Sequence, residues 1–145
     1  MRFLLLIAAL ALAACASQKP AAPSPAAPPR VDPLANGRAI FMTGRDLQGN
    51  RIIASPRPYK TSCVQCHRAD GSGGMHLPDG AVSADLRHHA LVNEQRHPYT
   101  IALLERAIST GMDNEGERLN PIMPRWRMSK TDLRDVATYV SEKLK

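Results

Sequence analysis

Cys63-Val64-Gln65-Cys66-His67 is the stretch that decides the fold, because its spacing is typical of a covalent haem attachment site. The cysteines lie three residues apart and the histidine follows the second, so one helical turn presents all three side chains on one face. Both thiols can then form thioether bonds to the vinyl groups along one porphyrin edge, while the imidazole points at the iron. The motif therefore predicts one covalent haem c, held by Cys63 and Cys66 with His67 as axial ligand.

Two other kinds of site also use a Cys-x-x-Cys pair. A redox dithiol is typical of a βαβ pattern, and few alternating, strand-like runs follow this pair. A zinc site would need two more ligands, for which the chain offers four irregularly spaced histidines, namely His76, His88, His89 and His97. The histidine directly after the second cysteine favours haem over both alternatives.

The first 14 residues have the pattern of an export signal. Arg2 supplies a positive charge, residues 3–12 are an apolar run too short for a dedicated membrane span, and small residues precede Cys15. This boundary resembles that of a bacterial lipoprotein signal, which implies cleavage before Cys15 and a lipid on its thiol. The alternative is an ordinary secretory signal with an incidental cysteine. Either signal predicts an exported chain, on the side of the membrane where haem is attached through thioethers.

Residues 15–32 are expected to be a lipidated cysteine followed by a tether. The segment is rich in proline and alanine, which cannot build a core and favour an extended chain of about 3.1 Å per residue. More than one acyl chain gives stable anchoring, so we expect the folded part to stay at a membrane surface. Ala16 is not the aspartate associated with inner-membrane retention, which slightly favours the outer membrane. Without lipidation, the chain would be in the soluble periplasm.

Residues 33–145 are expected to form one small domain. The domain has few aromatic residues for a core, namely Phe41, Tyr59, Tyr99, Trp126 and Tyr139. A bound porphyrin would supply the missing apolar mass, so we expect the apoprotein to fold poorly.

Start and stop signals predict three helices in this domain and no strand. The first helix is expected to start at Asp32-Pro33 and to end near Gly44. The second is expected to start at Pro98 or Thr100 and to end at Gly111, and the third to start at Ser129. Apolar residues of the last helix recur at helical spacing, namely Leu133, Val136, Ala137, Val140 and Leu144.

The domain resembles a class I cytochrome c. In that family a glycine and an aromatic on an N-terminal helix meet an aromatic on the C-terminal helix, and Gly37, Phe41 and Tyr139 match these positions. The haem motif follows the first helix, and Met123-Pro124 precedes the last one, as in the family. The resemblance implies an all-α cytochrome c fold, a few short helices wrapped around one haem. The long stretch 45–61 before the motif departs from the family pattern.

Met123 is the expected second axial ligand of the iron. It lies in Pro121-Ile122-Met123-Pro124, where each proline restricts the preceding residue to an extended conformation. A stiff loop limits the entropy cost of holding a weakly binding thioether on iron. Met75 and Met112 are the main alternatives, and one of the four histidines is a further one.

Two groups of residues are expected to support the haem. The resemblance implies that His67 donates its second ring N–H to a loop carbonyl at a proline, for which Leu77-Pro78 is the candidate. Arg125 and Trp126 follow the methionine loop and could donate to a propionate; their alternative is ordinary surface packing.

The charge of the chain bears on its partners. Loss of residues 1–14 would leave 18 basic and 13 acidic residues, a net charge of +5, scattered rather than clustered. An exported haem domain meets little nucleic acid, so we expect acidic redox proteins as donor and acceptor. The resulting hypothesis is a non-enzymatic, membrane-tethered carrier of single electrons in the bacterial periplasm. Two alternatives remain: a haem peroxidase or gas or redox sensor with a displaceable methionine, and an electron-transfer subunit of a larger dehydrogenase or oxidase.

Overall fold

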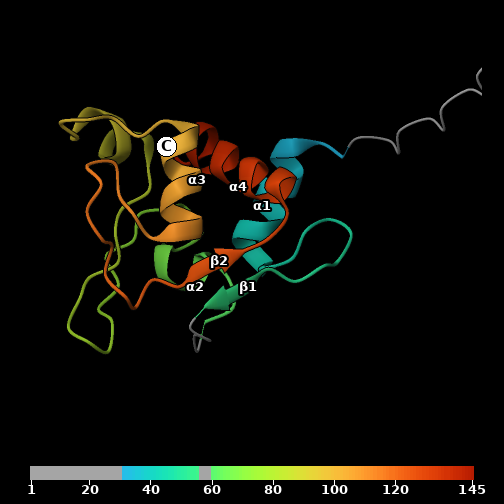
Figure 1. The fold of residues 1–145 in the computed structure, drawn as a ribbon, viewed down its shortest axis with the longest axis horizontal. Coiled ribbons are helices and arrows are strands. Elements are labelled where there is room, and N and C mark those ends of the chain that lie inside the picture. Colours follow the sequence, from blue (N-terminus) through green and yellow to red (C-terminus); the bar gives the residue numbers. More distant parts are fainter. Residues whose placement is uncertain (1–30, 56–59) are drawn as a thin grey trace, which may run out of the picture.

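The computed structural model describes residues 31–55 and 60–145, and these residues are mostly helical. The elements, in chain order, are α1 (Pro33–Thr43), β1 (Ile53–Ser55), α2 (Val64–His67), the π-helix η1 (His89–Asn93), α3 (Ile101–Thr110), β2 (Arg125–Arg127) and α4 (Lys130–Lys143). Figure 1 shows α1, α3 and α4 gathered together, with α2 and the short sheet to one side of them. The predicted signal, Cys15 and residues 16–30 of the tether lie outside the described residues.

The three predicted helix starts are confirmed by side-chain caps. Asp32 accepts a hydrogen bond from the Leu34 amide, and Pro33 follows it as the first helical residue. Thr100 and Ser129 cap α3 and α4 in the same way. Gly44 and Gly111 end α1 and α3 in the left-handed conformation that glycine adopts without a steric penalty.

The crossing of α1 and α4 depends on close backbone approach at Gly37. A Cβ atom at this position would lie 2.1 Å from the carbonyl oxygen of Asp135, so only glycine permits the contact. One helical turn further on, the rings of Phe41 and Tyr139 pack with centroids 5.6 Å apart. The three residues that carried the family resemblance therefore meet at one helix crossing.

Asn36 adds a polar link to the same crossing that the sequence did not reveal. Its amide nitrogen donates to Asp132 and Asp135 on α4, at 2.9 Å each. Its amide oxygen accepts from the backbone of Leu47 at 2.9 Å, which fastens the loop after α1. The amide nitrogen and the amide oxygen of the buried Asn36 side chain thus join α1 to α4 and to the loop after α1.

The expectation of no strands is wrong. Residues 53–55 and 125–127 form a two-stranded antiparallel sheet, in which Ala54 pairs with Trp126 and Ser55 with Arg125. The sheet connects part of the unusual 45–61 stretch to the segment directly after Met123. Among the described residues, no helix is long and apolar enough to cross a bilayer.

Candidate haem-binding site

The Cys-x-x-Cys-His motif forms the predicted helical turn. The His67 amide donates to the carbonyl of Cys63 at 2.9 Å, which brings both ends of the motif onto one turn. Gln65, between the two cysteines, accepts hydrogen bonds from the backbone amides of Thr61 at 2.6 Å and Ser62 at 3.3 Å. The side chain of Gln65 thereby ties the turn to the segment that leads into it.

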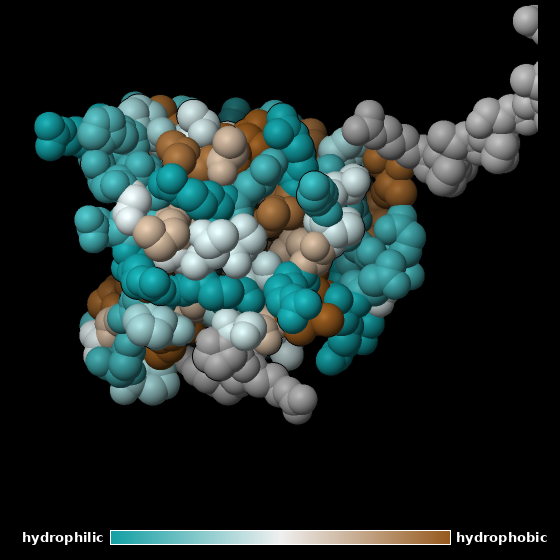
Figure 2. All heavy atoms as spheres, viewed as in Figure 1, coloured by the Kyte–Doolittle hydropathy of each residue, from teal (hydrophilic) through white to brown (hydrophobic). Residues whose placement is uncertain are grey.

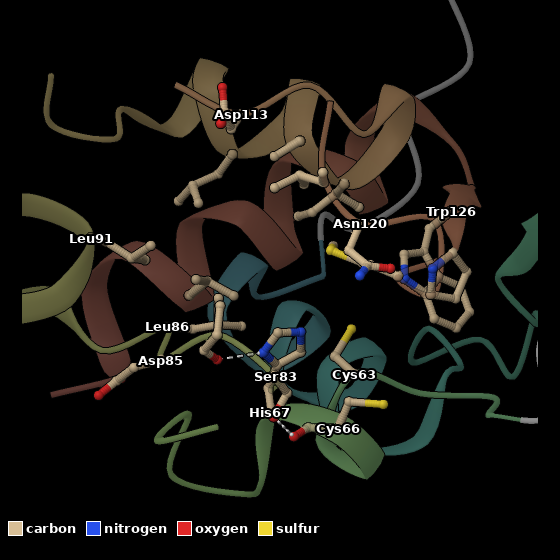
Figure 3. A pocket seen from close by; sticks show the side chains of 18 of the residues that line it. Cys63, Cys66, His67, Ser83, Asp85, Leu86, Leu91, Asp113, Asn120 and Trp126 are labelled. Carbon is tan, nitrogen blue, oxygen red and sulfur yellow. Dashed lines mark hydrogen bonds between the residues drawn. The ribbon is translucent and has the colours of Figure 1, made fainter. Parts of the chain in front are cut away.

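A cavity of about 360 Å³ opens beside this turn and reaches into the core. Its walls include five residues of the hydrophobic core, namely Phe41, Leu91, Leu104, Val136 and Val140. Cys63, Cys66 and His67 line the same cavity, and Figure 3 shows His67 and Cys63 on one side of it, across from Asn120 and Trp126. A large, mostly apolar cavity beside two thiols and an imidazole fits a porphyrin attached through thioethers.

His67 is oriented by one hydrogen bond from its ring. Its Nδ1–H donates to the carbonyl oxygen of Ala84 at 2.8 Å, which leaves Nε2 with a free lone pair (Figure 3). Burial lowers the pKa of His67, although the Ala84 carbonyl partly opposes this, so the imidazole stays neutral. A buried, neutral and oriented imidazole is suited to bind iron. The expected acceptor, Leu77-Pro78, is wrong: the chain returns from that turn and presents Ala84 instead.

The loop that carries Ala84 is fastened to the motif by Ser83. The Ser83 hydroxyl donates to the carbonyl of Cys66 at 2.8 Å and accepts from the Met75 amide at 2.9 Å. Gly73 packs against the same point, since a Cβ there would lie 2.2 Å from the Ala84 oxygen. The acceptor of His67 is therefore held by contacts on both sides.

Burial shifts the pKa values of both cysteine thiols of the motif in the same direction. Burial raises the pKa of Cys63 to about 12 and raises the pKa of Cys66 as well, with Lys60 acting in the opposite direction on Cys66. Both cysteines are free of disulfide bonds. Among the described residues, no three histidine, cysteine or acidic side chains are grouped as metal ligands, so the zinc alternative gains no support.

Met123 lies in the wall of the haem cavity, whereas the competing ligands do not. Neither Met75 nor Met112 contributes to the wall, and the same holds for the four alternative histidines, His76, His88, His89 and His97. The Met123 loop is closed by Asn120, whose carbonyl accepts from the Met123 amide at 3.1 Å and whose side chain accepts from Ile122 at 2.8 Å. The structure thus brings Met123 to the cavity on a short, hydrogen-bonded loop.

Trp126 and Arg125 have different surroundings. Trp126 is buried and lines the cavity, and its bond to a propionate stays a prediction. Arg125 does not line the cavity, and its guanidinium donates to the backbone carbonyls of Leu119 and Met123. The expectation that Arg125 binds a propionate is therefore not supported.

Sequence reasoning missed several polar residues of the cavity wall. They come from the loops around α3 and are Gln95, Tyr99, Asp113, Asn114 and Asn120. Asn114 donates to Gln95 at 3.2 Å, which joins the loops before and after α3. These residues belong to no sequence motif. The one sequence feature that pointed to any of them is the Asn120-Pro121 turn, which marks Asn120.

Comparison with known proteins agrees with this geometry. The family model described as cytochrome c matches residues 53–143, which include the haem motif, the Met123 loop and all of α4. No curated protein and no solved structure matches the chain. The matched range begins after α1, and the structure packs α1 on α4. The chain therefore belongs to the cytochrome c family, as a class I cytochrome c with one covalently bound haem c.

Proposed function

We propose that this protein is a monohaem electron carrier whose iron is ligated by His67 and Met123 and which passes single electrons between redox proteins. The observation that carries the proposal is the placement of Met123, since it is the methionine found in the wall of the haem cavity. A cytochrome c transfers electrons through its haem, and two protein ligands leave no open position for a substrate. The protein then acts by holding the cofactor and tuning its potential.

The chain contributes three things to this reaction. Cys63 and Cys66 would hold the haem covalently, through thioether bonds, at the turn that contains α2. His67 keeps one orientation because Ala84 accepts its Nδ1 proton, and this limits rearrangement around the iron when its charge changes. The apolar core side chains that line the cavity would shield the bound cofactor from water. The bound haem iron supplies the one-electron couple.

The alternative of a peroxidase or gas sensor would require an easily opened iron. The Gly71–Gly74 loop is the part of the sequence that could give such flexibility. Two of its glycines are packed, however: a Cβ at Gly71 would lie 2.7 Å from Leu144, and one at Gly73 would contact Ala84. These contacts hold the loop against Leu144 and against the carbonyl that orients His67.

Replacement of Met123 tests the carrier proposal. Met123→His should keep two protein ligands while lowering the midpoint potential, because imidazole favours ferric iron more than a thioether does. Met123→Ala should remove the methionine-to-iron absorption band and allow rapid binding of carbon monoxide to the reduced protein. Met112→Ala is the matched control, since Met112 does not line the cavity. Rapid carbon monoxide binding or peroxide reaction by the unaltered protein would contradict the proposal and favour the enzyme or sensor.

We also propose that the protein is tethered by a lipid on Cys15 to the periplasmic side of a bacterial membrane, with the outer membrane slightly favoured. The support is the pattern of residues 1–15 and the proline-rich segment that follows. Cys15→Ser should move the haem protein from the membrane fraction to the soluble periplasm, or block processing. Normal processing with full membrane retention would show that the anchor lies elsewhere. Co-purification after gentle solubilisation would reveal membership of a larger dehydrogenase or oxidase complex.

The proposed partners are redox proteins with acidic surfaces. The support is the excess of basic residues, and Figure 2 shows polar side chains over most of one face with apolar ones in small, separate patches. A scattered excess of positive charge steers encounters more than it fixes one docked pose. Electron exchange with an acidic partner should slow as salt rises, because the Debye length is about 10 Å at 0.1 M. A rate that does not depend on salt would argue against an acidic partner.

A further inference from the structure

Arg125 is placed directly beside the loop that carries Met123. It lies on β2, where it pairs with Ser55, and its side chain is half-buried. The guanidinium donates through one nitrogen to the Leu119 carbonyl at 3.0 Å and through another to the Met123 carbonyl. These two carbonyls flank the Asn120-Pro121-Ile122 turn, so one planar guanidinium spans the base of the methionine loop.

The other side of the guanidinium rests on the end of α3. A Cβ at Gly111 would lie 1.8 Å from Arg125 Nε, so the side chain needs the space that this glycine leaves. The Gly111 carbonyl in turn accepts from the Leu119 amide at 2.9 Å. Arg125 is thus held between a helix terminus and the loop, and its position is fixed by both.

The charged guanidinium of Arg125 donates its hydrogen bonds to backbone carbonyls. Within the described part of the chain, no carboxylate forms an ion pair with it. A charged donor makes stronger hydrogen bonds than a neutral one, and the planar guanidinium can serve two acceptors at a fixed spacing. A lysine ammonium, as a point charge on a flexible stem, cannot reproduce this geometry.

We propose that Arg125 is a positioning residue that holds the Met123 loop closed and so keeps the thioether on the iron. This inference rests on the proposed role of Met123 as axial ligand. Pro121 and Pro124 stiffen the loop locally, and Arg125 fastens its two ends to α3. Release of Met123 then requires both guanidinium bonds to break together with the loop movement.

The test compares haem-loaded variants by ligand exchange at ferric iron. Imidazole can bind only when Met123 has left, so its apparent affinity measures how readily the loop opens. Arg125→Gln should raise this affinity about tenfold or more, because both charge-assisted bonds are lost, and should weaken the methionine-to-iron band. Arg125→Lys should have a smaller effect in the same direction. Arg127→Gln is the matched control, since Arg127 lies on the same strand but is exposed, and it should leave both readouts unchanged.

The outcomes separate this inference from the proposal beneath it. If the unaltered protein shows the methionine band and Met123→Ala abolishes it, Met123 is the ligand. Unchanged imidazole affinity in folded Arg125→Gln and Arg125→Lys would then overturn the role of Arg125 alone. An equal change in Arg127→Gln would also overturn it, because the effect would come from net charge. A methionine band absent from the unaltered protein would overturn both. Far-UV circular dichroism shows whether each variant is folded. If Arg125→Gln does not fold, the imidazole affinity of Arg125→Lys, which keeps the charge, decides the test.

Discussion

At the scale of single residues, the polar side chain of Ser83 holds two backbone segments together. Its hydroxyl is buried and serves two backbone groups, the Cys66 carbonyl and the Met75 amide. One group belongs to the haem-binding turn and the other to the loop that returns to Ala84. The hydroxyl therefore couples the position of the motif to the position of the carbonyl that orients His67.

Ser83→Ala should lower the free energy of unfolding of the haem-loaded protein by about 1–3 kcal/mol. The reason is that the substitution leaves the partly buried Cys66 carbonyl and Met75 amide without this partner, and an unsatisfied group shielded from water carries a cost of this order. Denaturant unfolding measures the difference. Ser72→Ala is the matched control, because the Ser72 hydroxyl bonds to Asp70 at the surface, and it should change stability by less than about 0.5 kcal/mol. Equal losses in both variants would show that Ser83 has no special structural role.

At the scale of elements, the α1–α4 crossing sets two effects of one substitution against each other. Gly37→Ala should favour α1 by about 1 kcal/mol, because alanine is the better helix former. The added Cβ would lie 2.1 Å from the Asp135 carbonyl, a backbone atom that can yield only if the helices separate. Overpacking of this kind costs about 1–3 kcal/mol or more, so we expect a net loss of stability.

Thermal unfolding of the haem-loaded protein decides the sign of this effect. Ala35→Val is a suitable control, since it adds bulk at an exposed position of the same helix and should change stability only slightly. A Gly37→Ala protein that is more stable than the unaltered one would mean that helix propensity prevails and that the crossing tolerates a wider separation.

The elements also show why some of the fold could be read from the sequence and some could not. Helix starts were predictable because caps are local: Asp32, Thr100 and Ser129 each bond to an amide two or three residues on. The sheet was not, because strands of three residues carry no periodic pattern and their pairing joins Ala54 to Trp126, far apart in the chain. The π-helix His89–Asn93 likewise has no local signature.

The same distinction holds within the site. Cys63, Cys66 and His67 could be predicted because their chemistry depends on spacing within one turn. The partner of His67 could not, because Ala84 contributes only a backbone carbonyl, which any residue carries. The role of Arg125 was missed for a similar reason: its acceptors are the carbonyls of Leu119 and Met123. Contacts to backbone groups are set by the folded path of the chain and leave no trace in residue type.

At the scale of the whole molecule, cofactor and core are one structure. The buried side chains that join α1, α3 and α4, among them Phe41, Leu104 and Val136, also form the wall of the haem cavity. Haem therefore completes the hydrophobic core as well as carrying the electron. This arrangement suits a small domain, which has little other apolar surface to bury.

Removal of the haem should abolish cooperative folding. A buried void costs about 24 cal/mol per Å³, so an unfilled cavity of about 360 Å³ would cost on the order of 9 kcal/mol, and somewhat less where solvent enters. Small domains have a total stability of about 5–15 kcal/mol, so this cost is comparable to the whole. Chemical cleavage of the thioethers to Cys63 and Cys66 should leave a chain with reduced far-UV circular dichroism and no sharp thermal transition. The haem-loaded protein taken through the same buffers without the cleaving reagent is the control. A sharp transition in the haem-free chain would contradict the prediction, because it would show that α1, α3 and α4 can collapse onto one another and close the cavity unaided.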